Sequence, residues 1–349
     1  MSDYLSEFDF NFPLELIAKE PASPRDSSRL MVVSRESGEV SLNNFNNIGK
    51  HLPAGSLIVF NDTKVVPSRF EVKKPSGGKA VLTAVDILDD SIKVMSDRRL
   101  DLDMELTISS EDVFKVLRQE EKYFFIDPGE KFKSSGIIER EKIYKLFGLI
   151  GEAPLPPYIK NSPLSKQDIK DKYQSVFADK EGSYAAPTAS LHFTEELIEK
   201  LKADGHSFCF VTLHVGLGTF APLTGDNIVS GKLHKEFCEI SNLSAEMILT
   251  AKKQKRPVIA VGTTAMRTLE SFYQDGNIIS GKKETDLFIR EGYKFKVADG
   301  LITNFHIPRS SLLMLVSAFA GKEKIMAAYD LAIKEKFRLF SFGDAMLII

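Results

Sequence analysis

The chain has 349 residues, and its 46 Lys and Arg are nearly balanced by 48 Asp and Glu, giving a formal net charge of −2 at pH 7. Its 43% hydrophobic and 27% charged residues fit a globular protein and exclude disordered, collagen-like and coiled-coil chains. A chain of this length exceeds the roughly 250 to 300 residues beyond which one core usually divides, so we expect two domains or one domain with a large insertion.

The start of the chain and the two cysteines predict a cytoplasmic protein. MSDYLSEFDF carries acids where a signal peptide would be basic, and the nearly apolar stretch 312–320 is shorter than the ~20 residues that span a bilayer. Cys209 and Cys238 form no CxxC pair and have apolar or aromatic neighbours, which indicates buried free thiols. We expect no contact with a membrane.

The first segment predicts strands joined by a helical connection. FPLELIAK, with Pro13 at an early helical position, predicts a short helix. RLMVV at 29–33 and the residues near 39–42 predict two strands around a turn at Ser37-Gly38, and LIVFN at 57–61 has the continuous apolar character of a buried strand.

The middle of the chain, between about Val65 and Tyr158, has a different pattern. AVLTAVDI, SIKVMS, MELTIS, DVFKVLR and KYFFID are short alternating runs separated by turn residues, with little helical periodicity. This pattern predicts a small β-barrel or meander, and the Pro-rich run 154–158 marks its end.

Helices and strands alternate from about residue 168 onward. Thr194 caps a predicted helix, EELIEKLKA, which Gly205 ends before the strand FCFVTLHV; Ser244 caps AEMILTAKKQ, and Pro257 opens the strand VIAVG. The helix AMRTLESFY follows, then the strands DLFI and LITNFHI, the helices SSLLMLVSAFA and EKIMAAYDLAIKEKF, and a last strand, AMLII.

Together these patterns predict an α/β fold, a layered α/β domain with an inserted small β-barrel domain. The α/β domain would be discontinuous, comprising residues 1–66 and 156–349, and residues 67–155 would form the barrel.

Three strand ends carry polar residues suited to ligand binding. Gly262-Thr263-Thr264 lies where a strand meets a helix, whose free N–H groups can hold an anion, and Arg267 adds a cation one turn along; an ordinary cap is the alternative. Asn61-Asp62-Thr63-Lys64 and the run 303–309, TNFHIPR, follow two further strands.

TLHVGLGTFAP formally matches GxGxxA at 216–221, but Pro222 follows at once and no helix opens, so we infer only a glycine-rich loop beside His214. His234 and Glu236 form an HxE string without the PCxxC partner of zinc deaminases. With no HExxH motif, cysteine triplet or phosphate loop, we expect a group transfer that uses no metal.

Many strings, in order over nearly the whole chain, resemble the S-adenosylmethionine:tRNA ribosyltransferase-isomerase family of queuosine biosynthesis. Two departures are Ser190, where the family usually has Gly, and Ala265-Met266 in place of Ser-Val. The block from about Val65 to Gly151 carries few family strings. The strings are FDFNFPLELIA, RDSSRLMVV, LIVFNDTKVVPSR, PLPPYI, YAAPTASLHFT, TLHVGLGTFAP, HKEFCEI, VGTTAMRTLES, DLFIREGYKFKVADGLITNFHIPRSSLLMLVSAFAG and FSFGDAMLI.

The resemblance implies transfer and isomerisation of the ribosyl moiety of S-adenosylmethionine onto the aminomethyl group of 7-aminomethyl-7-deazaguanine at the tRNA wobble position. The products would be epoxyqueuosine-tRNA, adenine and methionine, with no cofactor beyond the ribosyl donor and no metal. A monomer would suffice for one anticodon arm.

The chemistry needs a base for the 5′ carbon next to the sulfonium and a hydrogen-bond donor for the departing adenine. The titratable candidates in matching motifs, not individually assigned, are His214, His306, Asp62 and Asp344. Phe220 and Phe305 suit the sulfonium, and Arg267 or Thr263-Thr264 the methionine carboxylate. The expected substrate-binding residues are Pro187, Thr188, Gly216, Gly218, Thr219, Thr263, Thr264, Arg267 and Asn304, and the expected RNA-binding residues are Lys64, Arg69 and Arg309.

Two alternatives remain from the sequence. One is an S-adenosylmethionine-dependent tRNA methyltransferase, also an α/β enzyme; the other is a non-catalytic RNA-binding barrel on an α/β scaffold. The near-zero charge further predicts few phosphate contacts and a shallow salt dependence of tRNA binding.

Overall fold

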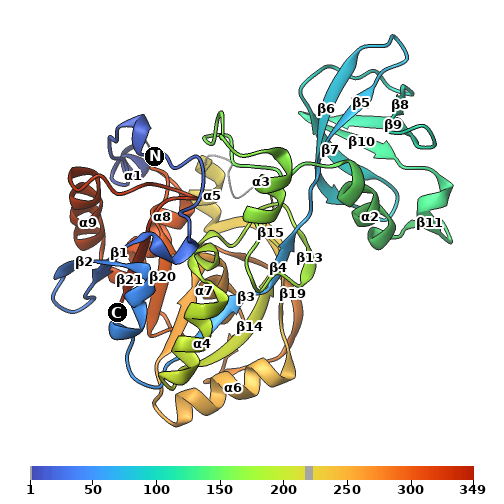
Figure 1. Ribbon diagram of the computed structural model, residues 1–349. Helices are drawn as coiled ribbons and strands as arrows, with labels where there is room; N and C mark the ends of the chain where they lie inside the picture. Colours follow the sequence, from blue (N-terminus) through green and yellow to red (C-terminus); the bar gives the residue numbers. More distant parts are fainter. Residues whose placement is uncertain (1, 217–222) are drawn as a thin grey trace.

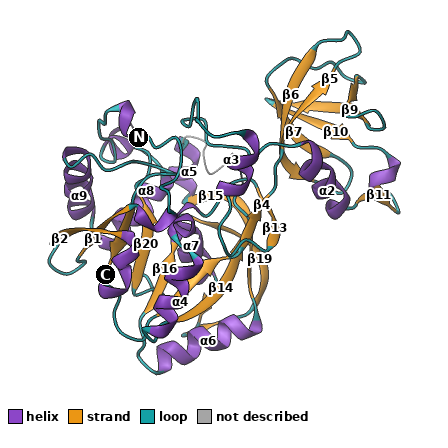
Figure 2. Ribbon diagram, in the orientation of Figure 1, coloured by secondary structure: helices purple, strands orange, loops and turns teal. Residues whose placement is uncertain are grey.

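A computed structural model describes residues 2–216 and 223–349 of the chain (Figure 1). The chain forms a large layered α/β part and a small closed β-barrel that projects from it (Figure 2). The expected α/β fold with an inserted barrel is confirmed.

A nine-stranded mixed sheet organises the large part, in the order β19-β15-β14-β3-β16-β20-β21-β1-β2. Its central neighbours β14, β3, β16 and β20 are parallel, so their carboxyl ends meet at one edge. On one side the sheet is completed by the antiparallel pairs of β14 with β15 and β15 with β19. On the other side, β20 with β21 and β1 with β2 are antiparallel, and β21 with β1 is parallel. The bounds are β1 (Arg29–Val33), β2 (Val40–Asn44), β3 (Leu57–Asn61), β14 (Ser207–Leu213), β15 (Lys232–Ile240), β16 (Val258–Val261), β19 (Gly281–Leu287), β20 (Gly300–Asn304) and β21 (Ala345–Ile348).

Helices cover both faces of this sheet, which explains why β3 is apolar at every core position. Leu57 and Val59 pack on one side with α6 (Asn242–Lys253), α7 (Gly262–Ser271), α8 (Ser311–Ala320) and α9 (Lys322–Lys334). Ile58 and Phe60 pack on the other side with α4 (Glu195–Ala203).

The barrel closes in the order β10-β7-β6-β5-β8-β9, with antiparallel neighbours throughout. The helix α2 (Arg140–Ile150) adds Phe147 to the barrel core, where it stacks on Phe70. The strands are β5 (Arg69–Lys73), β6 (Lys79–Ile87), β7 (Ile92–Ser96), β8 (Glu105–Thr107), β9 (Val113–Glu120) and β10 (Tyr123–Asp127).

Shorter elements complete the described chain. They are the helices α1 (Ser2–Ser6), α3 (Lys166–Lys172) and α5 (Gly225–Ser230), the 3-10 turns Leu14–Leu16, Arg25–Ser27, Phe45–Lys50, Glu130–Phe132 and Thr188–His192, and the strands β4 (Thr63–Val65), β11 (Lys133–Ser134), β12 (Ile137–Ile138), β13 (Lys180–Ser183), β17 (Tyr273–Gln274) and β18 (Asn277–Ile278).

Three expectations about local structure were wrong. FPLELIAK forms only the turn Leu14–Leu16, because Ile17 is extended and bridges to Leu339. The N-cap of α6 is Ser241, whose hydroxyl accepts from the Ser244 N–H. In the middle block, α2 forms because Ile143, Leu146 and Phe147 share one buried face.

Both cysteines are buried free thiols, as their apolar neighbours predicted. Burial raises the pKa of each to about 11. Within residues 2–216 and 223–349, no helix has the length and apolar character needed to cross a membrane.

Candidate active site

A pocket lies where the carboxyl ends of β16 and β20 approach the segment after β14, the edge at which open α/β sheets bind ligands. It holds about 810 Å³ of space free of protein atoms. We call it the strand-end pocket. The sequence-predicted residues that line it are Pro187, Thr188, Thr263, Thr264, Arg267, Asn304 and His306.

The first turn of α7 forms one wall of the strand-end pocket. Gly262 begins the helix with a φ of +87°, a left-handed conformation that favours glycine. Thr263 is buried, and the Thr264 hydroxyl is buried without a hydrogen-bond partner among the described residues. The helix therefore presents backbone N–H groups and an unpaired hydroxyl at the positive end of its dipole.

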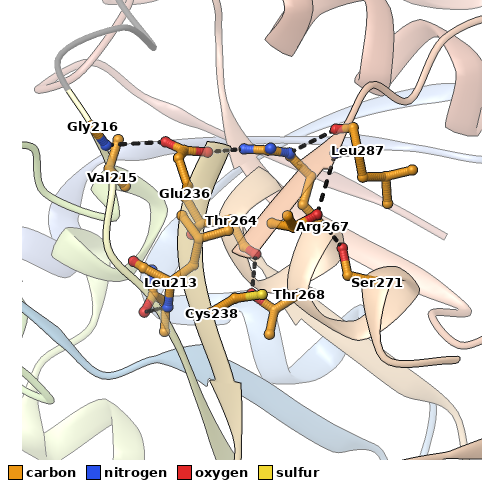
Figure 3. A network of polar contacts seen from close by, with 12 residues as sticks. Leu213, Val215, Gly216, Glu236, Cys238, Thr264, Arg267, Thr268, Ser271 and Leu287 are labelled. Atoms are coloured by element: carbon orange, nitrogen blue, oxygen red, sulfur yellow. Dashed lines mark hydrogen bonds and ion pairs between the residues drawn. The ribbon is translucent and has the colours of Figure 1, made fainter. Parts of the chain in front are cut away.

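Arg267, one turn along α7, pairs with Glu236 of β15 (Figure 3). Arg267 Nη1 donates to Glu236 Oε2, and Nε donates to the Leu287 carbonyl at 3.1 Å. Glu236 Oε1 accepts the Gly216 N–H at 3.1 Å. Both charged side chains are 5% exposed, and Arg267 Nη2 has no partner within the described chain. The carboxylate that Arg267 contacts thus belongs to the protein, and only Nη2 remains for a ligand.

Glu236 also lines the strand-end pocket, although it was not among the site residues predicted from the sequence. The sequence contains an indication that Glu236 is buried, because Glu236, Cys238 and Ile240 alternate along β15. All three are buried in the structure. A glutamate on the inward face of a strand needs a charged partner, which would have drawn attention to Arg267.

Asn304, at the end of β20, has its amide fixed by two buried acceptors. Its Nδ2 donates to His192 Nε2 and to the Phe340 carbonyl, both at 3.2 Å. His192 Nδ1 lies 2.8 Å from Ser28 Oγ, and burial, with smaller effects of Arg338 and Arg25, lowers the pKa of His192 to about 3. A neutral imidazole thus holds the Asn304 amide, whose buried Oδ1 has no partner among the described residues.

His306 lies next to Asn304 in the strand-end pocket. Its Nε2 is 2.8 Å from Thr303 Oγ1, and its backbone N–H donates to Tyr329 Oη at 2.7 Å. Burial lowers the pKa of His306 to about 3. At neutral pH the ring is therefore uncharged.

A second hollow lies between the barrel and the α/β part. We call it the interdomain groove; it has about 1090 Å³ of free space. Its barrel side includes Asp86, Arg140 and Tyr144, and its other side includes His214, Gly216, Lys235 and Phe237. Val215 and Glu236 line both the groove and the strand-end pocket, so the two hollows adjoin.

His214 is held firmly in the groove wall. Its Nδ1 lies 2.7 Å from Thr63 Oγ1, and its ring stacks on Phe237 with centroids 5.1 Å apart. Gly182 passes so close that an added Cβ would lie 2.8 Å from the imidazole. Burial, helped by the cations of Lys180 and Arg140, lowers the pKa of His214 to about 4.

The two aspartates lie outside both hollows. Asp62 Oδ1 accepts from Thr212 Oγ1 at 2.7 Å, and burial raises the pKa of Asp62. Asp344 is 1% exposed and accepts from Arg338 and from the Arg29 N–H, which ties β21 to its surroundings. The structure therefore brings the two histidines to the hollows and occupies both aspartates with other partners.

The three expected RNA-binding cations are solvent-exposed to a large extent, and each pairs with a carboxylate. Lys64 pairs with Glu181 at 2.9 Å, Arg69 with Glu152 at 3.1 Å, and Arg309 with Asp9. The expected site residues Gly218 and Thr219, and Phe220, lie outside the described residues. Phe305, the other aromatic expected near a sulfonium, lines the strand-end pocket.

Ser190, the departure from the family glycine, lies in the buried turn Thr188–His192. Its φ is not positive, so this position does not require glycine for backbone reasons. The Ser190 hydroxyl is buried without a partner among the described residues.

Among the described residues, no three His, Cys, Asp or Glu side chains gather in a group suited to a metal ion.

Comparison with known proteins shows the family to which the chain is similar. A family model described as "Queuosine biosynthesis protein" matches residues 5–348. Proteins named S-adenosylmethionine:tRNA ribosyltransferase-isomerase from Carboxydothermus hydrogenoformans and Staphylococcus haemolyticus are 44% and 40% identical, each alignment covering 99% of both chains. The crystal structure of S-adenosylmethionine tRNA ribosyltransferase from Thermotoga maritima matches with a TM-score of 0.56 and 32% identity, covering 99% of this chain and 100% of that one.

Proposed function

The chain belongs to the queuosine biosynthesis protein family, and we infer from this membership that it is an S-adenosylmethionine:tRNA ribosyltransferase-isomerase. Full-length relatives carry that name and give no support to the methyltransferase alternative. The enzyme transfers the ribosyl moiety of S-adenosylmethionine to the aminomethyl group of 7-aminomethyl-7-deazaguanine in tRNA. The products are epoxyqueuosine-tRNA, adenine and methionine.

The strand-end pocket binds the donor in this proposal. The supporting observation is that Arg267 Nη2, Asn304 Oδ1 and Thr264 Oγ1 are all buried, unpaired within the described chain, and belong to residues lining this one pocket. A buried polar atom without a partner is unfavourable, so a ligand that supplied the missing hydrogen bonds would bind with extra free energy. The methionine carboxylate suits Arg267 Nη2 and the first turn of α7.

The donor's other groups match the remaining walls. The ring of Phe305 offers a π face to the sulfonium, and Pro187 and Thr188 border the same space. Asn304 Oδ1 is a hydrogen-bond acceptor, which suits a donor such as a purine amino group or a ribose hydroxyl.

The two neutral histidines are the proposed proton-transfer groups. The reaction begins with loss of a proton from the 5′ carbon beside the sulfonium, and an uncharged imidazole can accept it. His306 borders the donor space and His214 borders the adjoining groove, whereas Asp62 and Asp344 border neither.

The test uses purified protein, S-adenosylmethionine labelled in its methyl group, and tRNA bearing 7-aminomethyl-7-deazaguanine. We expect equimolar adenine and labelled methionine, with the ribosyl carbons on the tRNA. Release of S-adenosylhomocysteine with label on the tRNA would instead identify a methyltransferase.

We further propose that the protein acts in the cytoplasm as a monomer and without a metal. Two buried free thiols fit a reducing compartment. Light scattering of the complex with tRNA should give one chain per tRNA, and EDTA should leave turnover unchanged.

A further inference from the structure

We propose that the interdomain groove receives the acceptor nucleotide of the tRNA, a single-stranded base that carries a primary amine, and that Glu236 receives this amine at the junction with the strand-end pocket. The proposal rests on the proposed function, because it assumes that the donor lies in the strand-end pocket. It adds a binding site for the second substrate and a positioning role for Glu236.

The interdomain groove is continuous with the strand-end pocket. The acceptor amine must reach the donor ribosyl group, so its site must open onto the strand-end pocket. The interdomain groove does so through Val215 and Glu236, which line both hollows. A hollow around Arg69 and Glu152 shares no lining residue with that pocket, and the hollow beside Arg25 has only about 200 Å³ of free space.

The walls of the groove have side chains suited to an unstacked base. Single-stranded bases bind by stacking on aromatic side chains, with cations near the backbone. The groove provides Tyr144 from the barrel and the stacked pair His214 and Phe237 from the α/β part.

Lys235 and Arg140 are the cationic side chains of the groove lining. Lys235 pairs with Glu284 at 3.2 Å, and both side chains are exposed. Arg140 donates a hydrogen bond to the Tyr144 hydroxyl and forms no ion pair with a carboxylate among the described residues. Arg140 is therefore the groove cation available to a phosphate or to a base edge.

Glu236 lies where an amine entering from the groove would reach the strand-end pocket. Glu236 is a buried carboxylate at the junction, and its two oxygens are oriented by Gly216 and Arg267. A primary ammonium entering from the groove would meet this carboxylate before it met the donor, while Arg267 faces the donor side. One ion pair would thus contact both substrates, the amine through Glu236 and the donor through Arg267.

The test compares Arg140→Ala and Tyr144→Ala with Tyr144→Phe, using the full chain and substrate tRNA. We expect KM for tRNA to rise about tenfold in the two alanine variants, with an unchanged Kd for S-adenosylmethionine in calorimetry, while Tyr144→Phe keeps most of the tRNA affinity because the stacking ring remains. Arg99→Ala, an exposed barrel arginine outside the groove, is the matched control and should leave KM unchanged.

For Glu236, Glu236→Gln should reduce turnover and raise KM for the aminomethyl tRNA, but leave binding of an otherwise identical tRNA with an unmodified guanine unchanged. Equal KM values in wild type, Arg140→Ala and folded Tyr144→Ala would overturn the groove assignment. If Tyr144→Ala fails to fold, the KM for tRNA of Arg140→Ala alone tests the groove assignment. Failure of the wild type to release adenine would overturn the proposed function itself, so the two failures are distinguishable.

Discussion

The Glu236 carboxylate and the Arg267 guanidinium form a buried ion pair at the junction of the strand-end pocket and the interdomain groove (Figure 3). The pair joins β15 to α7, and through Arg267 Nε it also contacts β19. The same two side chains therefore stabilise the sheet edge and line the proposed substrate sites. A change at either residue can therefore alter both the free energy of unfolding and substrate affinity, and the two must be measured separately.

Arg267→Ala should lower the free energy of unfolding by on the order of 3–5 kcal/mol, because it leaves the Glu236 carboxylate buried without its partner. Arg267→Met combined with Glu236→Gln should recover most of that loss, since no isolated charge remains. Donor affinity should stay weakened in both. Urea unfolding and calorimetry with S-adenosylmethionine measure the two effects, and no recovery in the double variant would contradict this account.

Thr264→Val should weaken S-adenosylmethionine binding about fivefold, the effect of losing about 1 kcal/mol from one hydrogen bond. Because the Thr264 hydroxyl has no partner among the described residues, the Tm of the Thr264→Val variant should not fall below that of the wild type. The matched control on the same helix is Thr268→Val, which removes a bond to the Thr264 carbonyl at 2.9 Å and does not touch the pocket. Equal donor affinity in both variants would argue against the assigned role of Thr264.

Gly182→Ala should displace the His214 ring and reduce kcat at least tenfold while S-adenosylmethionine still binds. Gly182 has a φ of +146°, and an added Cβ would lie 2.8 Å from the imidazole, so both backbone and side chain must shift. Gly136→Ala shares a positive φ of +80° but meets nothing within 4 Å. Comparable kcat losses in the two variants would show that backbone strain, and not His214, is responsible.

The protein should lose stability as the pH falls from about 6.5 toward 3. Burial lowers the folded pKa of His192 and of His306 to about 3 from a reference of 6.5. In that window the unfolded chain binds more protons, so each histidine lowers the free energy of unfolding by about 1.4 kcal/mol per pH unit, and neither contributes above pH 6.5. Urea unfolding between pH 5 and 6.5 gives the slope of the free energy of unfolding against pH, which reports the protons taken up on unfolding. His306→Gln should lower this uptake by about one proton. An unchanged slope would contradict the buried neutral state.

Binding of tRNA should depend only weakly on salt, with a slope of log K against log salt of about −2 to −4. Lys64, Arg69 and Arg309 each lie beside a carboxylate, which reduces the net charge they offer to phosphates. Arg69→Ala should make the slope shallower by about 0.7. Lys79→Ala, in an exposed pair on the barrel, is the control, and a slope near −10 would reveal a basic face that pairing does not neutralise.

The sequence was sufficient for the main architecture because local patterns report burial directly. The continuous apolar run Leu57–Asn61 forms a central strand covered on both faces, and the alternating runs of the middle block form the barrel. The cap at Thr194 was also predictable, since a hydroxyl that satisfies a free N–H acts within four residues. FPLELIAK failed as a helix because pairing of Ile17 with the distant Leu339 outweighed a short local preference.

For the site, local patterns in the chain were enough to show which strand ends carry polar residues, and so they indicated Thr263, Thr264, Asn304 and His306. Which polar residues share a hollow, and which are bonded elsewhere, depends on contacts between segments far apart in the chain. Asp62 and Asp344 occur in equally polar strings, yet long-range partners hold them away from both hollows. The pairing of Glu236 with Arg267, 31 residues apart, depends on the burial of two opposite charges together, and burial is a property of the folded chain.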